Sequence, residues 1–148
     1  MRTDRNANTH VKVLFNFENA RGETEIESVW ARPVVQGYQL DNIPFYAREA
    51  AYNDIVAADP DEDGVLWYAG LIVASGHSTI RLWFENESDV AGVRDRLREM
   101  GCQSELDLPR LVAVDIPPSL PYEKVKEYFE QMECAGVLEY EEACLGQA

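Results

Sequence analysis

The hydrophobic pattern of this chain changes character at Gly76. Before this residue, apolar side chains recur at every second position in short runs, which is the period of a β-strand; the clearest run is residues 11–17. After it, two stretches carry apolar side chains three and four positions apart, which is the spacing of an amphipathic helix. The sequence therefore predicts two different subdomains, residues 11–76 and residues 77–148.

The first subdomain is predicted to contain only strands. The alternation in residues 11–17 places the odd positions inward, and residues 23–30 predict a second strand with an acidic outer face and with Trp30 inward. About six short strands, separated by turn residues, fit this half of the chain, and such spacing favours a small β-barrel or a curled antiparallel sheet. Asn53 lies in a tight turn where a positive φ is expected.

The second subdomain is predicted to follow the order β-α-β-β-α-β. Its first helix has Ser88 as a candidate N-cap and ends at Gly101, and its second helix ends before Gly136. This order is that of the ferredoxin-like fold, in which two helices pack on one face of an antiparallel sheet. The fold class expected for the whole chain is α+β.

The ends and the cysteines of the chain point to a cytoplasmic protein. Residues 1–10 lack the apolar middle of a signal peptide and are expected to form a disordered leader. No apolar run approaches the roughly 18 residues of a membrane span. Cys102, Cys134 and Cys144 are scattered, which favours small buried hydrophobes over a disulfide framework or a zinc site. We expect neither a metal nor a cofactor.

The charge of the chain restricts its partners. It has 13 basic and 27 acidic residues, for a net charge of −14. Residues 1–76 hold 6 basic and 12 acidic residues, and residues 77–148 hold 7 and 15. Such a field disfavours direct binding to nucleic acid and favours a basic protein partner, although acidity for solubility alone is the plainer explanation.

Acidic side chains in the second subdomain form the most concrete docking surface. Glu123, Glu127 and Glu130 are spaced to share one helical stripe. Glu139 and its neighbours in the final strand extend this surface. The predicted partner-binding residues are Glu123, Glu127, Glu130, Glu139, Glu141 and Glu142.

Two central stretches are the most site-like. His77 lies among hydroxyl groups, and a nucleophile such as Ser78 would need it as a base together with an orienting acid, such as Asp41 or Asp54. The alternative is a hinge at Gly76, with His77 and Ser78 hydrogen-bonded to the loop backbone.

The stretch Leu40–Ala47 offers a second candidate site. Asn42 and Tyr46 are candidate ligand-binding residues beside Asp41 at the mouth of a loop. Alternatively, Asp41 only caps the turn that Pro44 fixes, and Phe45 is buried.

Five segments together resemble a bacterial family known as domain of unknown function 4265. They are Val11–Phe15, Leu40–Ala47, Asn53–Val56, Ser75–Thr79 and Glu139–Ala143. The likeness spans roughly residues 11–145, and the family commonly has glycine where this chain has Asn53. The resemblance implies a bacterial source and brings no activity with it.

These features support one leading hypothesis and two rivals. The leading one is a non-enzymatic acidic binding protein, in its sharpest form an immunity or antitoxin-type neutraliser of a basic toxin domain. The first rival is an enzyme or small-ligand-binding protein with a pocket between the halves around Asp41 and His77. The second is a homodimer formed through the sheet of the second half, and the oligomeric state stays open.

Overall fold

The computed structural model describes residues 10–146 of the 148-residue chain. The chain divides into two compact units between Ser75 and Gly76, next to the change in hydrophobic pattern. The predicted disordered leader lies outside the described residues except for His10, whose side chain contacts Asp41.

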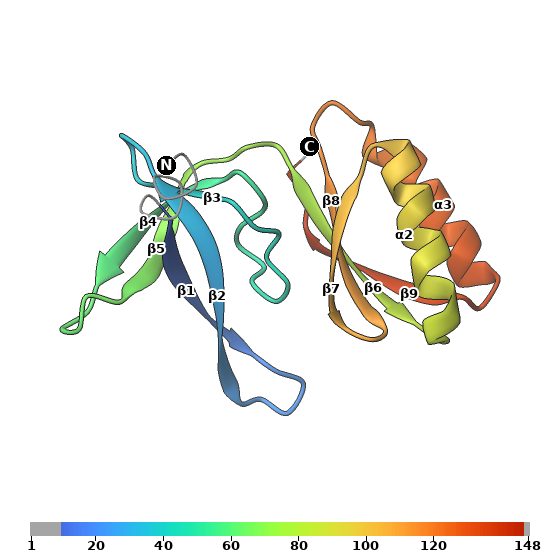
Figure 1. Ribbon diagram of the computed structural model, residues 1–148, viewed down its shortest axis with the longest axis horizontal. Coiled ribbons are helices and arrows are strands. Elements are labelled where there is room, and N and C mark those ends of the chain that lie inside the picture. Colours follow the sequence, from blue (N-terminus) through green and yellow to red (C-terminus); the bar gives the residue numbers. More distant parts are fainter. Residues whose placement is uncertain (1–9, 147–148) are drawn as a thin grey trace, which may run out of the picture. The chain divides into compact units, whose positions relative to one another are not determined.

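The first unit is a closed barrel of five strands in chain order (Figure 1). The strands are β1 (Val11–Glu18), β2 (Thr24–Pro33), β3 (Tyr38–Leu40), β4 (Ile55–Pro60) and β5 (Leu66–Val73). Consecutive strands pair antiparallel, and β1 pairs in parallel with β5 to close the barrel. The predicted barrel is confirmed, with five strands in place of about six. The positive φ at Asn53 is also confirmed, at 68°.

The pairing of β1 with β2 decides which side chains enter the barrel core. Val13 and Phe15 are buried, as the alternation in β1 predicts. The prediction for β2 was wrong, because Val29 is buried and Trp30 is 44% exposed. Val13 lies directly opposite Val29, and opposed residues of an antiparallel pair share a face, so Trp30 must point outward with Lys12.

The second unit is a four-stranded antiparallel sheet with two helices on one face (Figure 1). The sheet has the order β7-β8-β6-β9. The elements are β6 (Ser78–Phe84), η1 (Glu87–Asp89), α2 (Val90–Met100), β7 (Gln103–Leu108), β8 (Leu111–Ile116), α3 (Tyr122–Cys134) and β9 (Leu138–Cys144). The α+β class is therefore confirmed.

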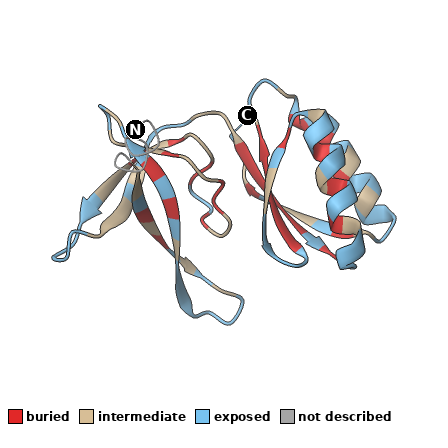
Figure 2. Ribbon diagram, viewed as in Figure 1, coloured by how far each residue is buried: buried red, intermediate tan, exposed pale blue. Residues whose placement is uncertain are grey.

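The helices end close to where the sequence predicts. Gly101 ends α2 with a φ of 103°, in the left-handed conformation that glycine adopts at little cost. Ser88 lies inside η1, so the predicted N-cap at this residue is wrong. Leu97 on α2 and Phe129 on α3 are fully buried, and the red segments of the ribbon in Figure 2 mark buried residues on the strands and helices of this unit.

An arginine on α2 covers part of the edge strand β7. The Nε of Arg94 donates to the Ser104 hydroxyl over 2.9 Å, and its Nη2 donates to the Ser104 carbonyl over 3.0 Å. The side chain therefore ties the middle of α2 to the outer strand of the sheet.

The three cysteines differ in environment. All are free thiols; Cys102 is buried, Cys144 is intermediate and Cys134 is exposed, so the prediction of buried cysteines is wrong for Cys134. Burial, and to a smaller extent the charge of Asp115, raises the pKa of Cys102 to about 12 from an ordinary value of 9.0.

We expect a thiol reagent at neutral pH to modify the exposed Cys134 readily. Cys102 should react at least about 1000-fold more slowly in the native protein than in denaturant, because burial shields its thiol and a pKa raised by three units leaves that much less thiolate. Peptide mass mapping after timed labelling measures both rates. Denaturant should equalise them. Equal rates in the native protein would contradict the buried position of Cys102.

Candidate functional site

Asn42, rather than Asp41, fixes the turn after β3. The Oδ1 of Asn42 accepts a hydrogen bond from the backbone N–H of Trp30 over 2.9 Å, and the backbone N–H of Asp41 donates to the Trp30 carbonyl over 2.8 Å. The Asp41 carboxylate points to basic groups instead: His10 Nε2 lies 2.8 Å from it and Arg32 Nη2 lies 3.5 Å from it. The predicted cap at Asp41 is therefore wrong.

A cavity of about 370 Å³ lies beside this turn, within the barrel unit. We call it the Trp30 cavity; it is lined by His10, Trp30, Asp41 and Asn42. The structure thus brings together two of the residues chosen from the sequence, Asp41 and Asn42. It also adds Trp30 and His10, which sequence reasoning did not select.

Glu27 holds the rest of the loop. Its carboxylate accepts hydrogen bonds from the backbone N–H groups of Phe45, Tyr46 and Ala47, with the last two at 3.0 Å. The Tyr46 ring stacks on Phe17, with centroids 4.7 Å apart and planes 10° from parallel. Tyr46 is therefore held by packing on the barrel, and Phe45 is only half-buried, not buried as predicted.

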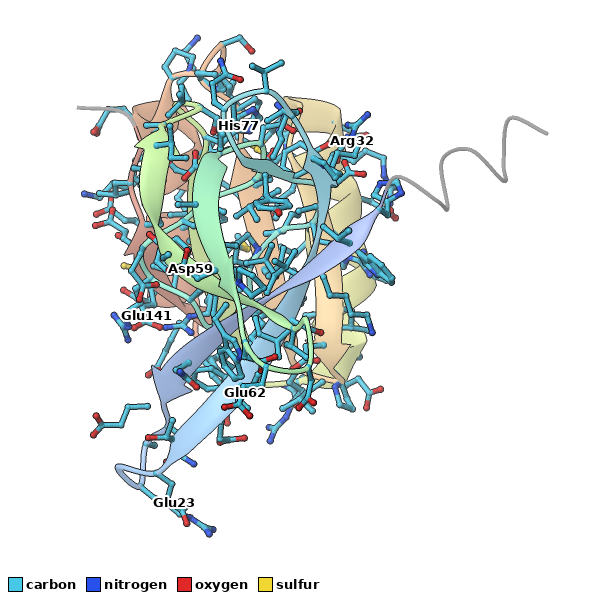
Figure 3. The ribbon with its side chains drawn as sticks, turned by 90° about the vertical axis from the view of Figure 1, so that its left-hand side faces the viewer. Glu23, Arg32, Asp59, Glu62, His77 and Glu141 are labelled. Atoms are coloured by element: carbon cyan, nitrogen blue, oxygen red, sulfur yellow. The ribbon has the colours of Figure 1, made fainter. Side chains whose placement is uncertain are left out.

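His77 pairs with an acid that the sequence did not single out. Its Nδ1 lies 2.8 and 3.1 Å from the two carboxylate oxygens of Asp115 on β8. The side chains of His77 and Asp115 are only 14% and 5% exposed. Burial raises the pKa of Asp115, and the hydrogen bond with His77 opposes this rise. Figure 3 labels His77 in the second unit.

The other proposed partners of His77 have contacts of their own. Asp54 accepts hydrogen bonds from the Ser75 hydroxyl and the Ser75 N–H, both over 2.8 Å, and from the Ala51 N–H. Ser78 is fully buried, and its hydroxyl accepts a hydrogen bond from the Gly146 N–H over 2.9 Å. These contacts favour structural roles, because a nucleophile must be able to reach its substrate.

The six predicted partner-binding glutamates fall into two groups. Glu141 is paired with Arg81, and Glu142 accepts a hydrogen bond from the Tyr122 hydroxyl over 2.7 Å and lies 3.7 Å from Lys126. Burial and this hydrogen bond raise the pKa of Tyr122, and the charge of Glu142 raises the pKa of Lys126. The exposed group consists of Glu123, Glu127, Glu130 and Glu139.

A second cavity, of about 300 Å³, lies where α3 passes into β9. We call it the Trp83 pocket; its lining residues are Trp83, Phe84, Glu85, Glu133, Gly136, Leu138 and Glu139. Trp83 is 45% exposed and lies opposite Glu139 across the β6–β9 pair, so the two side chains share a face.

The turn into β9 brings two further carboxylates to this pocket. Gly136 has a φ of 76°, and the Glu85 N–H donates to the Val137 carbonyl over 3.0 Å. Glu133, from the last turn of α3, accepts a long hydrogen bond of 3.4 Å from the Tyr140 N–H. Three glutamates and one exposed tryptophan therefore line the same pocket. Carboxylates and an indole face are the groups that bind a lysine or arginine side chain.

The described residues 10–146 contain neither a candidate membrane helix nor a candidate metal site. No helix there is long and apolar enough to pass through a membrane. No group of three or more histidine, cysteine, aspartate or glutamate side chains there is arranged to hold a metal ion.

Comparisons with known proteins give a family and one structural relative. A family model described as "Domain of unknown function (DUF4265)" matches residues 27–140. A solved structure described as "Novel crystal structure of a hypothetical protein from Neisseria gonorrhoeae" is 26% identical, with a TM-score of 0.78 over 93% of this chain and 96% of that one. No curated protein matches the chain.

Proposed function

Because the chain belongs to the family described as Domain of unknown function (DUF4265), a description that names no activity, we propose a function from the Trp83 pocket itself. The protein binds a basic protein partner and holds a lysine or arginine side chain of that partner in the pocket. The observation that carries this proposal is that Glu85, Glu133 and Glu139 line one pocket together with the exposed Trp83.

The chemistry of the pocket favours a cationic side chain over other ligands. A cation over an indole face gains about 0.5 to 2 kcal/mol, depending on how far it is desolvated. Three carboxylates add Coulombic attraction and repel anionic ligands. The aliphatic stem of a lysine or arginine also suits the apolar part of the lining, which includes Phe84 and Leu138.

Exposed glutamates on α3, next to the pocket, also favour a cationic partner. Glu130 stands one helical turn before Glu133 on α3, and with Glu123 and Glu127 it continues an acidic stripe away from the pocket. With the net charge of −14, this stripe speeds the approach of a basic partner. In its sharpest form the proposal is an immunity-type protein that covers a basic toxin domain.

Two finer assignments accompany the proposal. The β-α-β-β-α-β order and the β7-β8-β6-β9 sheet support a ferredoxin-like second unit, an architecture that hosts many binding functions. Three free cysteines support a reducing compartment such as the cytoplasm.

We expect Glu133→Gln/Glu139→Gln to weaken the complex with the basic partner about 10- to 100-fold, because it removes two of the three carboxylates at the pocket. The tagged full chain is used to retain partners from the native host at low salt, and affinity is then measured with the purified basic protein. The matched control is Glu49→Gln/Glu62→Gln, which changes the net charge equally at exposed positions of the barrel unit (Figure 3 labels Glu62).

Retention by the wild type and the control, but not by the pocket variant, supports the proposal. Recovery of no basic protein contradicts it. Equal weakening by the two double variants also contradicts it, because general acidity would then account for the binding.

A further inference from the structure

The Trp30 cavity in the barrel unit shares no residue with the Trp83 pocket and has a different chemistry. Its volume of about 370 Å³ falls in the range of small-molecule sites, roughly 300 to 1,000 Å³. It lies where the outer face of β2 meets the turn at Asp41 and Asn42.

The barrel register leaves an indole ring at this cavity. Val29 and Ala31 fill the core, so Trp30 between them points outward. The Nζ of Lys12, from the opposite strand position, lies 5.1 Å from the centroid of the ring. The His10 ring meets it edge-on, with centroids 6.2 Å apart and planes at 76°. One basic group therefore lies over the indole ring and a second meets it edge-on.

Basic side chains outnumber acidic ones around this ring. Arg32 projects from the same face of β2 as Trp30, two residues further along, and Lys12 stands across from Trp30 (Figure 3 labels Arg32). One oxygen of the Asp41 carboxylate already contacts His10, and the other lies near Arg32. In a chain of net charge −14, the Lys12 and Arg32 side chains therefore place positive charge beside the residues that line this cavity.

We infer that the Trp30 cavity binds a small planar ligand that carries an anionic group. The ring of the ligand stacks on Trp30, and its carboxylate or phosphate is held by Lys12 and Arg32. Asn42 lines the same cavity, and its Oδ1 accepts a hydrogen bond from the backbone N–H of Trp30. Nucleotides and aromatic carboxylic acids share this chemistry.

The test titrates the ¹⁵N-labelled full chain with four probes and follows the three indole N–H signals by NMR. AMP carries a ring and a phosphate, and indole-3-acetate carries a ring and a carboxylate. Adenosine has the ring alone, and inorganic phosphate has the anion alone. Trp30→Phe assigns the Trp30 signal.

We expect at least one of AMP and indole-3-acetate to shift the Trp30 signal, with the Trp67 and Trp83 signals unmoved, and to bind at least 10-fold more tightly than adenosine or phosphate alone. Which of the two binds identifies the class of anion. Arg32→Gln should weaken that binding about 10-fold, whereas the matched control Arg21→Gln, at the exposed hairpin tip, should leave it unchanged.

Three results would overturn the inference. The first is the lack of any Trp30 shift with both ring-bearing anions at millimolar concentration. The second is that neither of these anions binds more tightly than adenosine and phosphate. The third is equal weakening by the two arginine variants. None of these results bears on the proposal for the Trp83 pocket, because each is read from the Trp30 signal in the barrel unit.

Discussion

Replacing His77 by alanine is expected to destabilise the second unit by about 3 to 5 kcal/mol at neutral pH, the usual cost of leaving a buried charged group without its partner. The substitution leaves the Asp115 carboxylate, which is 5% exposed, without its imidazole partner. The penalty comes from an uncompensated buried charge more than from the lost contact itself.

The cost of His77→Ala should depend on pH in a definite direction. Burial raises the pKa of Asp115 above the ordinary 3.8, and the histidine opposes the rise. A group with a raised folded-state pKa binds protons more tightly in the folded protein, so stability falls as the pH rises from the unfolded to the folded pKa. Removing His77 raises the folded pKa further and widens this window. The cost is therefore smallest in acid and grows towards neutral pH.

Hydrogen exchange of β8 amides, read by mass spectrometry from pH 4 to pH 8, isolates the second unit from the barrel. The control measures His77→Ala in the Asp115→Asn background, by comparing Asp115→Asn with His77→Ala/Asp115→Asn. Neither of these two proteins has the Asp115 carboxyl, so the difference between them should lose the pH dependence that this group causes. If the destabilisation caused by His77→Ala stayed constant across this pH range, it would not come from the buried charge of Asp115.

Replacing Glu27 by alanine is expected to destabilise the loop over residues 43–47 by about 2 to 4 kcal/mol, because three backbone N–H groups lose one charged acceptor. The amides of Phe45, Tyr46 and Ala47 should exchange at least about 30-fold faster, since 1.4 kcal/mol corresponds to a factor of ten. Amide exchange by NMR measures each of them separately.

Two variants bracket this result. Glu27→Gln keeps an acceptor oxygen without the charge, so a smaller loss is expected. Glu25→Ala removes the same charge from the same strand but not from the loop, because Glu25 accepts from the Asn19 side chain instead. Comparable loop destabilisation by Glu25→Ala would point to the charge of β2 rather than to the three hydrogen bonds.

Alternation in the sequence predicted the barrel but not the orientation of every strand. A period of two shows which side chains share a face; it does not say which face lies inside. In β2 the row of glutamates suggested an acidic outer face and turned Trp30 inward. The long-range pairing of Val13 with Val29 determines which face of β2 lies inside. It also places the Glu27 carboxylate within reach of the backbone N–H groups of the loop over residues 43–47.

The contacts of the candidate sites were harder to predict, for the same reason. Asp115 is an acid within an otherwise apolar strand, which signals a buried partner, but that partner is 38 positions away and is set by the pairing of β6 with β8. Of the Trp83 pocket, only Glu139 was chosen from the sequence. Glu85 follows β6 and Glu133 lies in the last turn of α3, so the two meet at the pocket only because the turn at Gly136 brings α3 and β9 beside β6. The spacing of residues along the sequence does not predict this arrangement.

The side chains on the outer strands of the sheet also limit how copies of this protein can join. An open strand edge invites the addition of a strand from another chain, and this is a common route to aggregation. On β7 the Ser104 carbonyl is held by Arg94, and on β9 the Tyr140 N–H faces Glu133. A second chain would have to displace these side chains before it could extend the sheet. The outer strands therefore resist fusion of two molecules into one continuous sheet.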